Sequence, residues 1–315
     1  MAQEALGRVI LTVLHSLAGM ISLLPSRAVY WMGAALGRFL FAVGFRRKVV
    51  ERNLLLAFPG DSQEVASLRS RLLAEAFRHL GQVFLEIFLL FGFFDRYVRR
   101  NIRVRGIENW AKAKESGKGV IFLASHVGNW ELMAAGFADA GDPVMLVTKH
   151  LKPEWFHRAI ERARGRAGVL ATYEPRTLKD VFRHLAKNGT VGMVLDQYTG
   201  PPVGVRVPFF GIPVGTNLGL ATVARRTSAP VVPIMNHRLA DGSFEVEIFP
   251  ALQWIPDEHP DVELARNTAA YSAILEGQVR LYPGQWLWSH QRFKGDLSPL
   301  REGEWEEGRA RRARL

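Results

Sequence analysis

The sequence predicts an α/β protein in which helices flank a mostly parallel central sheet and a helical, membrane-anchoring region precedes the sheet. Three observations lead to this prediction. From about residue 102 onward, short apolar runs of strand length alternate with segments of helical periodicity, as in a parallel sheet covered on both faces. Polar residues follow several of these runs directly, as they do where strands end at a sheet edge. A long, largely apolar stretch opens the chain.

The composition excludes several classes of protein. A chain of 315 residues, 48% of them hydrophobic, is long enough for one large domain or a domain with appendages. It contains no cysteine, which excludes a disulfide scaffold, thiolate metal ligands and a thiol nucleophile. The net charge of +11 calls for an acidic partner. No nucleic-acid-binding motif is recognisable, so an anionic membrane lipid or an acidic protein is the expected partner, and nucleic acid is not.

The first 48 residues are expected to form a membrane anchor. Leu6–Leu24 and Ala28–Phe45 are mostly apolar, but each contains charged residues. A spanning helix needs about 20 apolar residues, so the first stretch is a marginal candidate and the second a poorer one. A pair of amphipathic or core helices that does not enter lipid is the alternative. The basic cluster that follows, Arg46, Arg47 and Lys48, predicts that the next domain stays on the cytoplasmic side.

Residues 49–100 are expected to be a helical lead-in to the sheet. Ser62–Phe77 has the periodicity of an amphipathic helix. Val83–Phe94, with the sequence VFLEIFLLFGFF, contains Glu86 as its only charge. The second stretch is too short to span a bilayer, so it is expected to be a core helix or an interfacial patch, or to line a groove for an acyl chain.

The strands of the sheet are expected at six places, and residues 49–298 are expected to form the α/β domain, lead-in included. Five apolar runs predict strands, and one alternating segment predicts an exposed or edge strand. They are Ile102–Val104, Val120–Ala124, Pro143–Val147, Val191–Leu195, Pro230–Met235 and, as the alternating segment, Phe244–Phe249. A helix is expected at Pro153–Arg166. Residues 299–315 form a tail whose basic run Arg309–Arg314 is expected to be solvated or to contact anionic lipid.

The stretch Val120–Glu131, VIFLASHVGNWE, carries the strongest signal of chemistry. Its strand delivers His126 to the carboxyl end, where open α/β sheets bind ligands, and Glu131 falls on the first turn of the next helix. A carboxylate at this spacing can fold back to orient the imidazole, while the other ring nitrogen takes a proton from a substrate hydroxyl. The alternative is a hydrogen-bonded structural histidine.

HVGNWE resembles the His-x4-Glu block of the lysophospholipid acyltransferase superfamily, in the form found in the bacterial lipid A late acyltransferases. The resemblance extends from about Asn53 to Lys294. It implies that His126 and Glu131 are catalytic and that Asn129 lies at the substrate site.

Three further stretches carry the resemblance, and the first of them is Phe156–Gly168, FHRAIERARGRAG. The family has an arginine near the end of this helix that serves the active site. By position Arg164 is the first choice and Arg166 the second. An arginine there can bind a phosphate with two parallel hydrogen bonds. The alternative is a solvent-facing charge on a helix.

The second stretch is Val194–Thr216, which in the family shapes the acyl-donor site. The resemblance implies substrate contacts at Asp196, Gln197, Phe209, Phe210, Gly211 and Thr216. Thr216 is expected to cap the start of a helix. Asp196 is expected to hold Arg164 or to position a head group, or else to cap backbone amides in a loop.

The third stretch is Tyr282–Lys294, YPGQWLWSHQRFK, which resembles the carboxyl-terminal block of the family. Trp286 and Trp288 suit an interface or the wall of a groove, although both can be core residues. His290, Arg292 and Lys294 supply positive charge for a phosphate or for the acyl carrier. Trp288 and Arg292 are therefore expected to bind substrate.

Together these stretches predict an O-acyltransferase that needs no cofactor and no metal. His126 would remove a proton from a hydroxyl of a glycolipid such as a lipid A precursor, and the oxygen would attack an acyl thioester on acyl carrier protein or coenzyme A. Backbone N–H groups near Gly128 and the Arg164 side chain are the expected oxyanion donors. The expected location is the cytoplasmic side of the bacterial inner membrane.

Other functions remain open at this point. Phosphatidylinositol mannosides are an alternative acceptor within the same superfamily. A metal-dependent hydrolase would need further His, Asp or Glu ligands near His126. A membrane-tethered scaffold for an acidic protein is the non-catalytic alternative.

Overall fold

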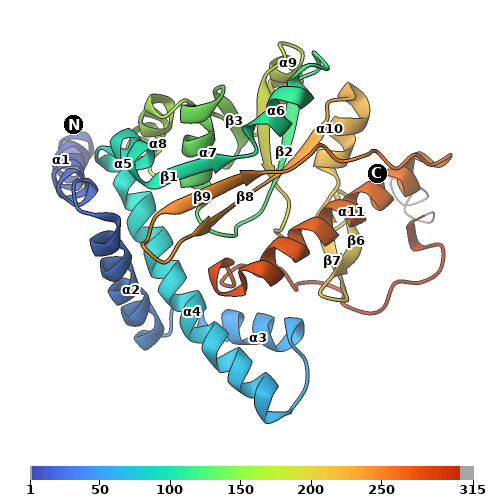
Figure 1. The fold of residues 1–315 in the computed structure, drawn as a ribbon, viewed down its shortest axis with the longest axis horizontal. Helices are drawn as coiled ribbons and strands as arrows, with labels where there is room; N and C mark the ends of the chain where they lie inside the picture. Colours follow the sequence, from blue (N-terminus) through green and yellow to red (C-terminus); the bar gives the residue numbers. More distant parts are fainter. Residues whose placement is uncertain (1, 306–315) are drawn as a thin grey trace.

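The computed structural model describes residues 2–305, so the predicted basic run Arg309–Arg314 lies outside the described residues. Figure 1 shows a twisted sheet with helices on both faces and two further helices, α1 and α2, along one side. The strands of the main sheet are β1 (Ile102–Arg105), β2 (Val120–Ala124), β3 (Val144–Val147), β4 (Val169–Thr172), β5 (Thr190–Val194), β8 (Val231–Arg238) and β9 (Phe244–Ile248).

The seven strands lie in the order β1-β9-β8-β2-β5-β3-β4. Every neighbouring pair is parallel except β8 and β9, which are joined as an antiparallel hairpin. The prediction of a mostly parallel sheet flanked by helices is therefore confirmed. All six expected strands are present, while β4 was not predicted.

The expectation that Phe244–Phe249 is an exposed or edge strand was wrong. This segment, β9, pairs with β1 on one side and β8 on the other. Its alternating pattern arises because Phe244, Val246 and Ile248 are buried while the residues between them are partly exposed. Alternation along a strand reports which face is covered and says nothing of the position of the strand in the sheet.

Helices cover both faces of the sheet. They are α5 (Phe94–Asn101), α6 (Ile107–Lys114), α7 (Trp130–Ala140), α8 (Glu154–Arg166), α9 (Thr177–Leu185), α10 (Gly219–Thr227) and α11 (Pro260–Leu281). The central strand β2 shows the two layers directly. Val120, Phe122 and Ala124 pack into a core with residues of α7, whereas Ile121 and Leu123 pack into a second core with residues of α9, α10 and α11.

A hairpin of β6 (Gly204–Phe209) and β7 (Ile212–Asn217) stands apart from the main sheet. The two residues of its turn, Phe210 and Gly211, have φ angles of +53° and +73°, as a type I′ turn requires. Thr216 lies within β7, so the expectation that it caps a helix was wrong. The following helix, α10, begins after Leu218, which has no side-chain oxygen for such a cap.

The amino-terminal region consists of α1 (Ala2–Ser22), α2 (Ser26–Ala42), α3 (Arg47–Ala57) and the long helix α4 (Gln63–Phe88), which ends in the 3₁₀ turn η1 (Leu89–Phe91). A second 3₁₀ turn, η2 (Pro283–Gln285), follows α11. The hydroxyl of Ser62 caps α4 by accepting a hydrogen bond from Val65 N–H. Helices α2 and α4 cross with their backbones in close contact. A Cβ on Gly81 would lie only 2.1 Å from the nitrogen of Gly37, so the crossing requires glycine there.

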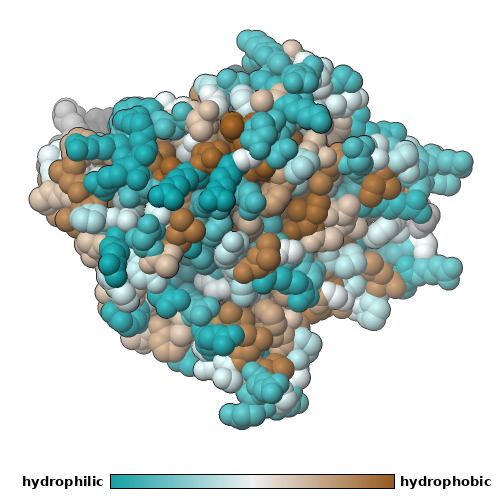
Figure 2. Space-filling model, in the orientation of Figure 1, coloured by the Kyte–Doolittle hydropathy of each residue, from teal (hydrophilic) through white to brown (hydrophobic). Residues whose placement is uncertain are grey.

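Among residues 2–305, no single helix has the length and apolar character needed to cross a membrane. Taken together, α2 and α3 meet that requirement, but they are bent by 96° at the break between them. Several large apolar side chains of α1 and α2 are exposed, among them Val9, Met20, Trp31 and Phe39. Figure 2 shows apolar residues at the surface over α1, at the left edge of the molecule.

Candidate active site

His126 lies just beyond the carboxyl end of β2, where the sequence predicted it. Its Nδ1 is 2.7 Å from Oδ1 of Asp196, which follows β5 at the same sheet edge. The two residues are 70 positions apart in the chain and meet because β2 and β5 are neighbours in the sheet. His126 and Asp196 are both buried.

The Asp196 carboxylate is fixed by two more donors. Its Oδ2 accepts hydrogen bonds from the His126 backbone N–H and from Trp286 Nε1, each at 2.7 Å. Burial alone would raise the pKa of Asp196, but the charge and hydrogen bonds of His126 and the bond from Trp286 keep that pKa below its ordinary value. The ionised carboxylate accepts the Nδ1 proton of His126, so the Nε2 lone pair points to the opposite side.

Three side chains surround the rest of the imidazole. The Gln197 amide nitrogen is 3.3 Å from His126 Nε2. The His290 ring stacks on His126 with a centroid distance of 4.8 Å and an interplanar angle of 29°. Trp130 meets His126 edge-on, also at 4.8 Å. Burial, followed by the charge of His126, lowers the pKa of His290 to about 4, so the stacked ring is neutral at pH 7.

Glu131 does not orient His126, and this prediction was wrong. Its two carboxylate oxygens bind the Arg164 guanidinium, with Nε to Oε2 at 3.0 Å and Nη2 to Oε1 at 2.5 Å. Asp196 likewise binds His126 and not Arg164. Glu131 lies on the first turn of α7 and Arg164 on the last turn of α8, and both side chains are buried. Glu131 therefore meets Arg164 and not His126. The pair joins two helices beside the site.

Arg164 is the one buried residue among the four arginines of α8; Arg158, Arg162 and Arg166 are exposed. Burial would lower the pKa of Arg164, but Glu131 raises it above its ordinary value, so the guanidinium is charged. Its Nη1 also binds Glu161 at 3.2 Å. Both carboxylates that it binds belong to the protein, which leaves it poorly suited to serve as an oxyanion donor.

Gly128 and Asn129 shape the loop after His126. The Gly128 N–H donates to the carbonyl of Gln285 at 2.9 Å, so this expected oxyanion donor is already used. Gly128 has a φ of +66°, and a Cβ on it would lie 2.2 Å from Oδ1 of Asn236. Asn129 caps α7 by accepting from the N–H groups of Glu131 and Leu132. Its amide therefore stabilises the loop.

A buried ion pair beneath this loop was not predicted. The Glu86 carboxylate binds the guanidinium of Arg238 and accepts a hydrogen bond from the Asn129 amide at 3.0 Å. Both members of the pair are buried. A single carboxylate within the apolar run Val83–Phe94 was the signal for it, because a buried charge needs a partner.

The residues expected at the donor and substrate sites form the wall behind Asp196 and Gln197. Phe209, Phe210, Trp286 and Trp288 belong to one buried apolar cluster. Burial lowers the pKa of Arg292 to about 10, and the side chain stays charged at pH 7. Its guanidinium donates to the carbonyls of Gln197 and Gly215 and to the Thr216 hydroxyl, at 2.9, 3.1 and 2.8 Å.

Arg292 and the buried aromatic cluster therefore hold the segment after β5 in place from inside the protein. The turn formed by Phe210 and Gly211 is anchored by a hydrogen bond from Phe210 N–H to Glu276. Trp288 is 1% exposed and donates its indole N–H to the carbonyl of Pro283. Most of the residues that the sequence motifs assigned to substrate binding therefore pack and position other groups, while one pair, His126 and Asp196, presents a basic nitrogen at the sheet edge.

Among the described residues 2–305, no group of three or more His, Asp or Glu side chains is arranged to hold a metal ion. The geometry suits transfer of a proton from a hydroxyl to His126 Nε2, since the carboxylate fixes the tautomer and a neutral imidazole is the acceptor.

Known proteins are similar in sequence to most of the chain. The family model described as bacterial lipid A biosynthesis acyltransferase matches residues 5–295. A lipid A biosynthesis lauroyltransferase of Escherichia coli (strain K12) is 27% identical over 277 residues, covering 86% of this chain and 87% of that protein. A lipid A biosynthesis palmitoleoyltransferase of the same strain is 27% identical over 275 residues, covering 86% of each. A phosphatidylinositol mannoside acyltransferase of Mycobacterium tuberculosis (strain ATCC 25618 / H37Rv) is 22% identical over 245 residues, covering 76% of this chain and 75% of that protein.

Proposed function

The chain belongs to the bacterial lipid A biosynthesis acyltransferase family, and from this premise we propose that it moves a fatty acyl chain from a thioester to a hydroxyl of a lipid A precursor. Its family makes it a glycolipid O-acyltransferase of the late lipid A type. The observation that supports the chemistry is the His126 imidazole, which Asp196 holds through Nδ1 so that Nε2, in contact with the Gln197 amide, can act as the base.

The proposed reaction has two steps. His126 Nε2 takes the proton of the acceptor hydroxyl while the oxygen attacks the thioester carbonyl, which forms a C–O bond and a tetrahedral oxyanion. The carbon–sulfur bond then breaks, and the thiolate takes the proton from the His126 imidazolium. Asp196 stabilises that imidazolium and does not itself become protonated. No covalent acyl-enzyme is needed, because the acceptor oxygen is the nucleophile.

Gln197 is the proposed oxyanion donor. Its amide nitrogen lies 3.3 Å from His126 Nε2, beside the point where the reacting oxygen would sit. Arg292 donates to the backbone carbonyl oxygen of Gln197 and so fixes the backbone from which the side-chain amide projects. His290 and Trp130 flank the imidazole and limit its rotation.

The proposed donor is acyl carrier protein, with acyl-coenzyme A as the second choice. Arg46 and Lys149 lie near enough to His290 to lower its pKa, which puts two cations beside the site. The chain as a whole carries a net charge of +11. Carrier protein is acidic, and opposite charge on the enzyme raises its rate of association.

The proposed site of action is the surface of the bacterial inner membrane, on its cytoplasmic side, with α1 and α2 lying in one leaflet. Their exposed apolar side chains support this arrangement. Trp31, Phe39 and Val43 are 58–61% exposed on α2 and just after it, and Val9 and Met20 are similarly exposed on α1. Helices with one apolar and one polar face bind at the lipid–water boundary without spanning it.

One experiment tests the proposed activity. The purified protein is incubated with acyl carrier thioester or acyl-coenzyme A and with a panel of acceptors. The panel includes lipid A precursors and phosphatidylinositol mannosides, and the products are identified by mass spectrometry. We expect one added acyl chain on a lipid A precursor, fastest with the carrier thioester and slower as salt is added. Transfer to mannosides alone would refute the proposed acceptor.

A second experiment tests the membrane arrangement. The double variant Trp31→Glu, Phe39→Glu should float with anionic vesicles much less than the wild type, because both side chains would leave the apolar phase. Leu178→Glu is the matched control, since Leu178 is also an exposed apolar residue but belongs to α9. Equal flotation of the double variant and the control would contradict α2 as a lipid-binding helix.

A further inference from the structure

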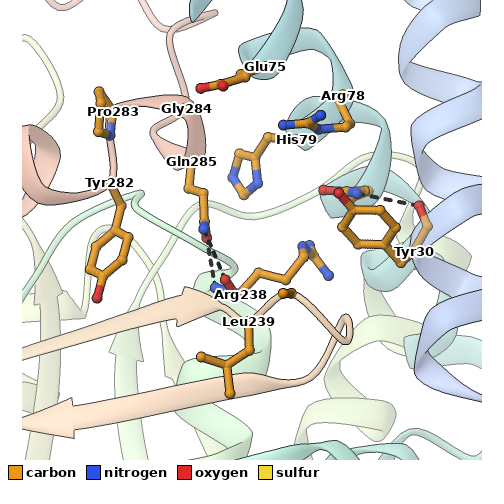
Figure 3. Close-up of a pocket in the computed structure, with 12 residues that line it drawn as sticks. Tyr30, Glu75, Arg78, His79, Arg238, Leu239, Tyr282, Pro283, Gly284 and Gln285 are labelled. Atoms are coloured by element: carbon orange, nitrogen blue, oxygen red, sulfur yellow. Dashed lines mark hydrogen bonds between the residues drawn. The ribbon is translucent and has the colours of Figure 1, made fainter.

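A pocket of about 300 Å³ lies away from His126, between α2, α4, the turn after β8 and η2. Figure 3 shows side chains from these elements around one space, with the His79 ring beside Gln285 and above the Arg238 side chain. Its volume is at the lower end of the range of about 300–1,000 Å³ in which small-molecule sites fall. The pocket is large enough for a small polar ligand and too small for a long acyl chain together with a head group.

His79 is the central polar group of the pocket. It is 2% exposed, and neither ring nitrogen makes a hydrogen bond of standard geometry. Burial and then the charge of Arg238 lower the pKa of His79 to about 3, against a smaller raising effect of the Gly128 backbone. At pH 7 the ring is neutral, so it offers one N–H donor and one nitrogen acceptor. Arg238 Nε is a second buried donor without a partner.

The charges of the pocket balance. The Arg238 guanidinium is compensated by Glu86, with which it forms a buried ion pair. The pocket is also lined by one acidic and one basic side chain, Glu75 and Arg78, and within residues 2–305 neither forms an ion pair or a side-chain hydrogen bond. An anion would gain Arg78 but would face the Glu75 carboxylate. A neutral ligand avoids that repulsion.

The lining combines acceptors, donors and aromatic rings. Glu75 and one His79 nitrogen can accept, and Arg78 and Arg238 Nε can donate. Tyr30 and Tyr282 also line the pocket, and one face of the Tyr282 ring is already stacked on His237. A hydroxyl group is both donor and acceptor, so a ring with several hydroxyls can satisfy both kinds of partner. The C–H face of such a ring packs on an aromatic side chain.

We propose that this pocket is a saccharide site, which holds one sugar ring through its hydroxyl groups. It is separate from the His126 site but contacts the same loop, because Gly128 N–H bonds to Gln285 and the Gly128 carbonyl faces His79. The source of the sugar rests on the proposed function. One sugar unit of the acceptor glycolipid would be held here while a hydroxyl elsewhere on the same glycolipid reaches His126.

Saturation-transfer NMR on the full chain in detergent tests the site without acyl transfer, so its result stands apart from the proposed function. The probes are methyl glucoside, methyl mannoside, methyl glucosaminide and methyl phosphate, each of which carries methyl protons that report binding. We expect at least one glycoside to bind, and Arg78→Ala and His79→Gln to weaken that binding about tenfold or more. Arg71→Ala is the matched control, since Arg71 is an exposed arginine of α4 that does not line the pocket.

The outcomes are distinct. Failure of every glycoside to bind, binding of methyl phosphate alone, or glycoside binding that is unchanged in Arg78→Ala would overturn the proposal. Because His79 is buried, thermal unfolding checks whether His79→Gln folds, and the exposed Arg78 decides the case if it does not. A higher acceptor KM with unchanged kcat in Arg78→Ala assigns the sugar to the glycolipid. An unchanged acceptor KM, with glycoside binding lost, assigns the site to a free sugar.

Discussion

Two carboxylate-centred pairs at this sheet edge, Asp196 with the His126 imidazole and Glu131 with the Arg164 guanidinium, differ in whether a basic nitrogen remains for chemistry. The imidazole of the first pair uses Nδ1 and presents Nε2. The guanidinium of the second is bound by Glu131 through two hydrogen bonds and by Glu161 through a third. One motif, HVGNWE, thus supplies a member of each. A carboxylate within a catalytic motif can therefore stabilise the fold and take no part in the reaction. The two roles are distinguished by the partner of the carboxylate, because an imidazole keeps a basic lone pair on Nε2 and a guanidinium has none.

The largest effect should come from His126→Ala. Transfer should fall by about 10⁴-fold, the upper end of what a general base contributes, because the imidazole that takes the proton is lost. The rate is measured as the amount of acylated product formed per unit time, read by mass spectrometry. His259→Ala, at an exposed histidine before α11, is the control. Transfer within tenfold of wild type by folded His126→Ala protein would remove this pair from the mechanism.

Asp196→Asn should have the next largest effect, on the order of 10³-fold. The His126 N–H and Trp286 both bind Oδ2, so the new NH2 group would replace Oδ1 and face Nδ1. That contact favours the tautomer with its proton on Nε2, which cannot act as a base. Nitrogen-15 NMR of the imidazole reads the tautomer. Asp142→Asn, which alters a surface ion pair with Lys114, should leave both the spectrum and the rate unchanged.

Gln197→Ala should lower kcat by about 10²-fold, in line with loss of one oxyanion donor, while KM for both substrates changes little. Gln63→Ala, at an exposed glutamine that begins α4, is the matched control. An increase in KM with normal kcat would mean that the amide binds the ground state and does not stabilise the oxyanion.

The smallest effect on the rate should come from the second pair. Glu131→Leu leaves Arg164 buried without its main partner, which should cost about 3–5 kcal/mol of unfolding free energy. The rate per folded molecule should stay within about tenfold of wild type. In the double variant Glu131→Leu, Arg164→Leu both buried charges are gone, so denaturant unfolding should show much of the stability restored. A loss of rate as deep as that of His126→Ala in the stable double variant would make this pair catalytic.

Most of the fold was predictable because its signals are local. Apolar runs and the glycines and prolines between them located six of the seven strands of the main sheet, and helix α8 was placed to within one residue. The hairpin β6–β7 was missed because a turn with positive φ usually contains Asn or Gly at its first position, and here Phe210 occupies it. Its strain is compensated by packing against Phe58 and Trp288, which the local sequence does not reveal.

The sequence by itself determined the class of the protein, the position of His126 at a strand end and the family, since each depends on residues close together in the chain. The tertiary structure alone decided the pairing of charges. Asp196 reaches His126 over 70 positions and Arg164 reaches Glu131 over 33, because the order of strands and the contact of α7 with α8 bring them together. Spacing along a chain limits which partners can meet, but in a buried site the partner is set by the neighbouring elements that pack against it.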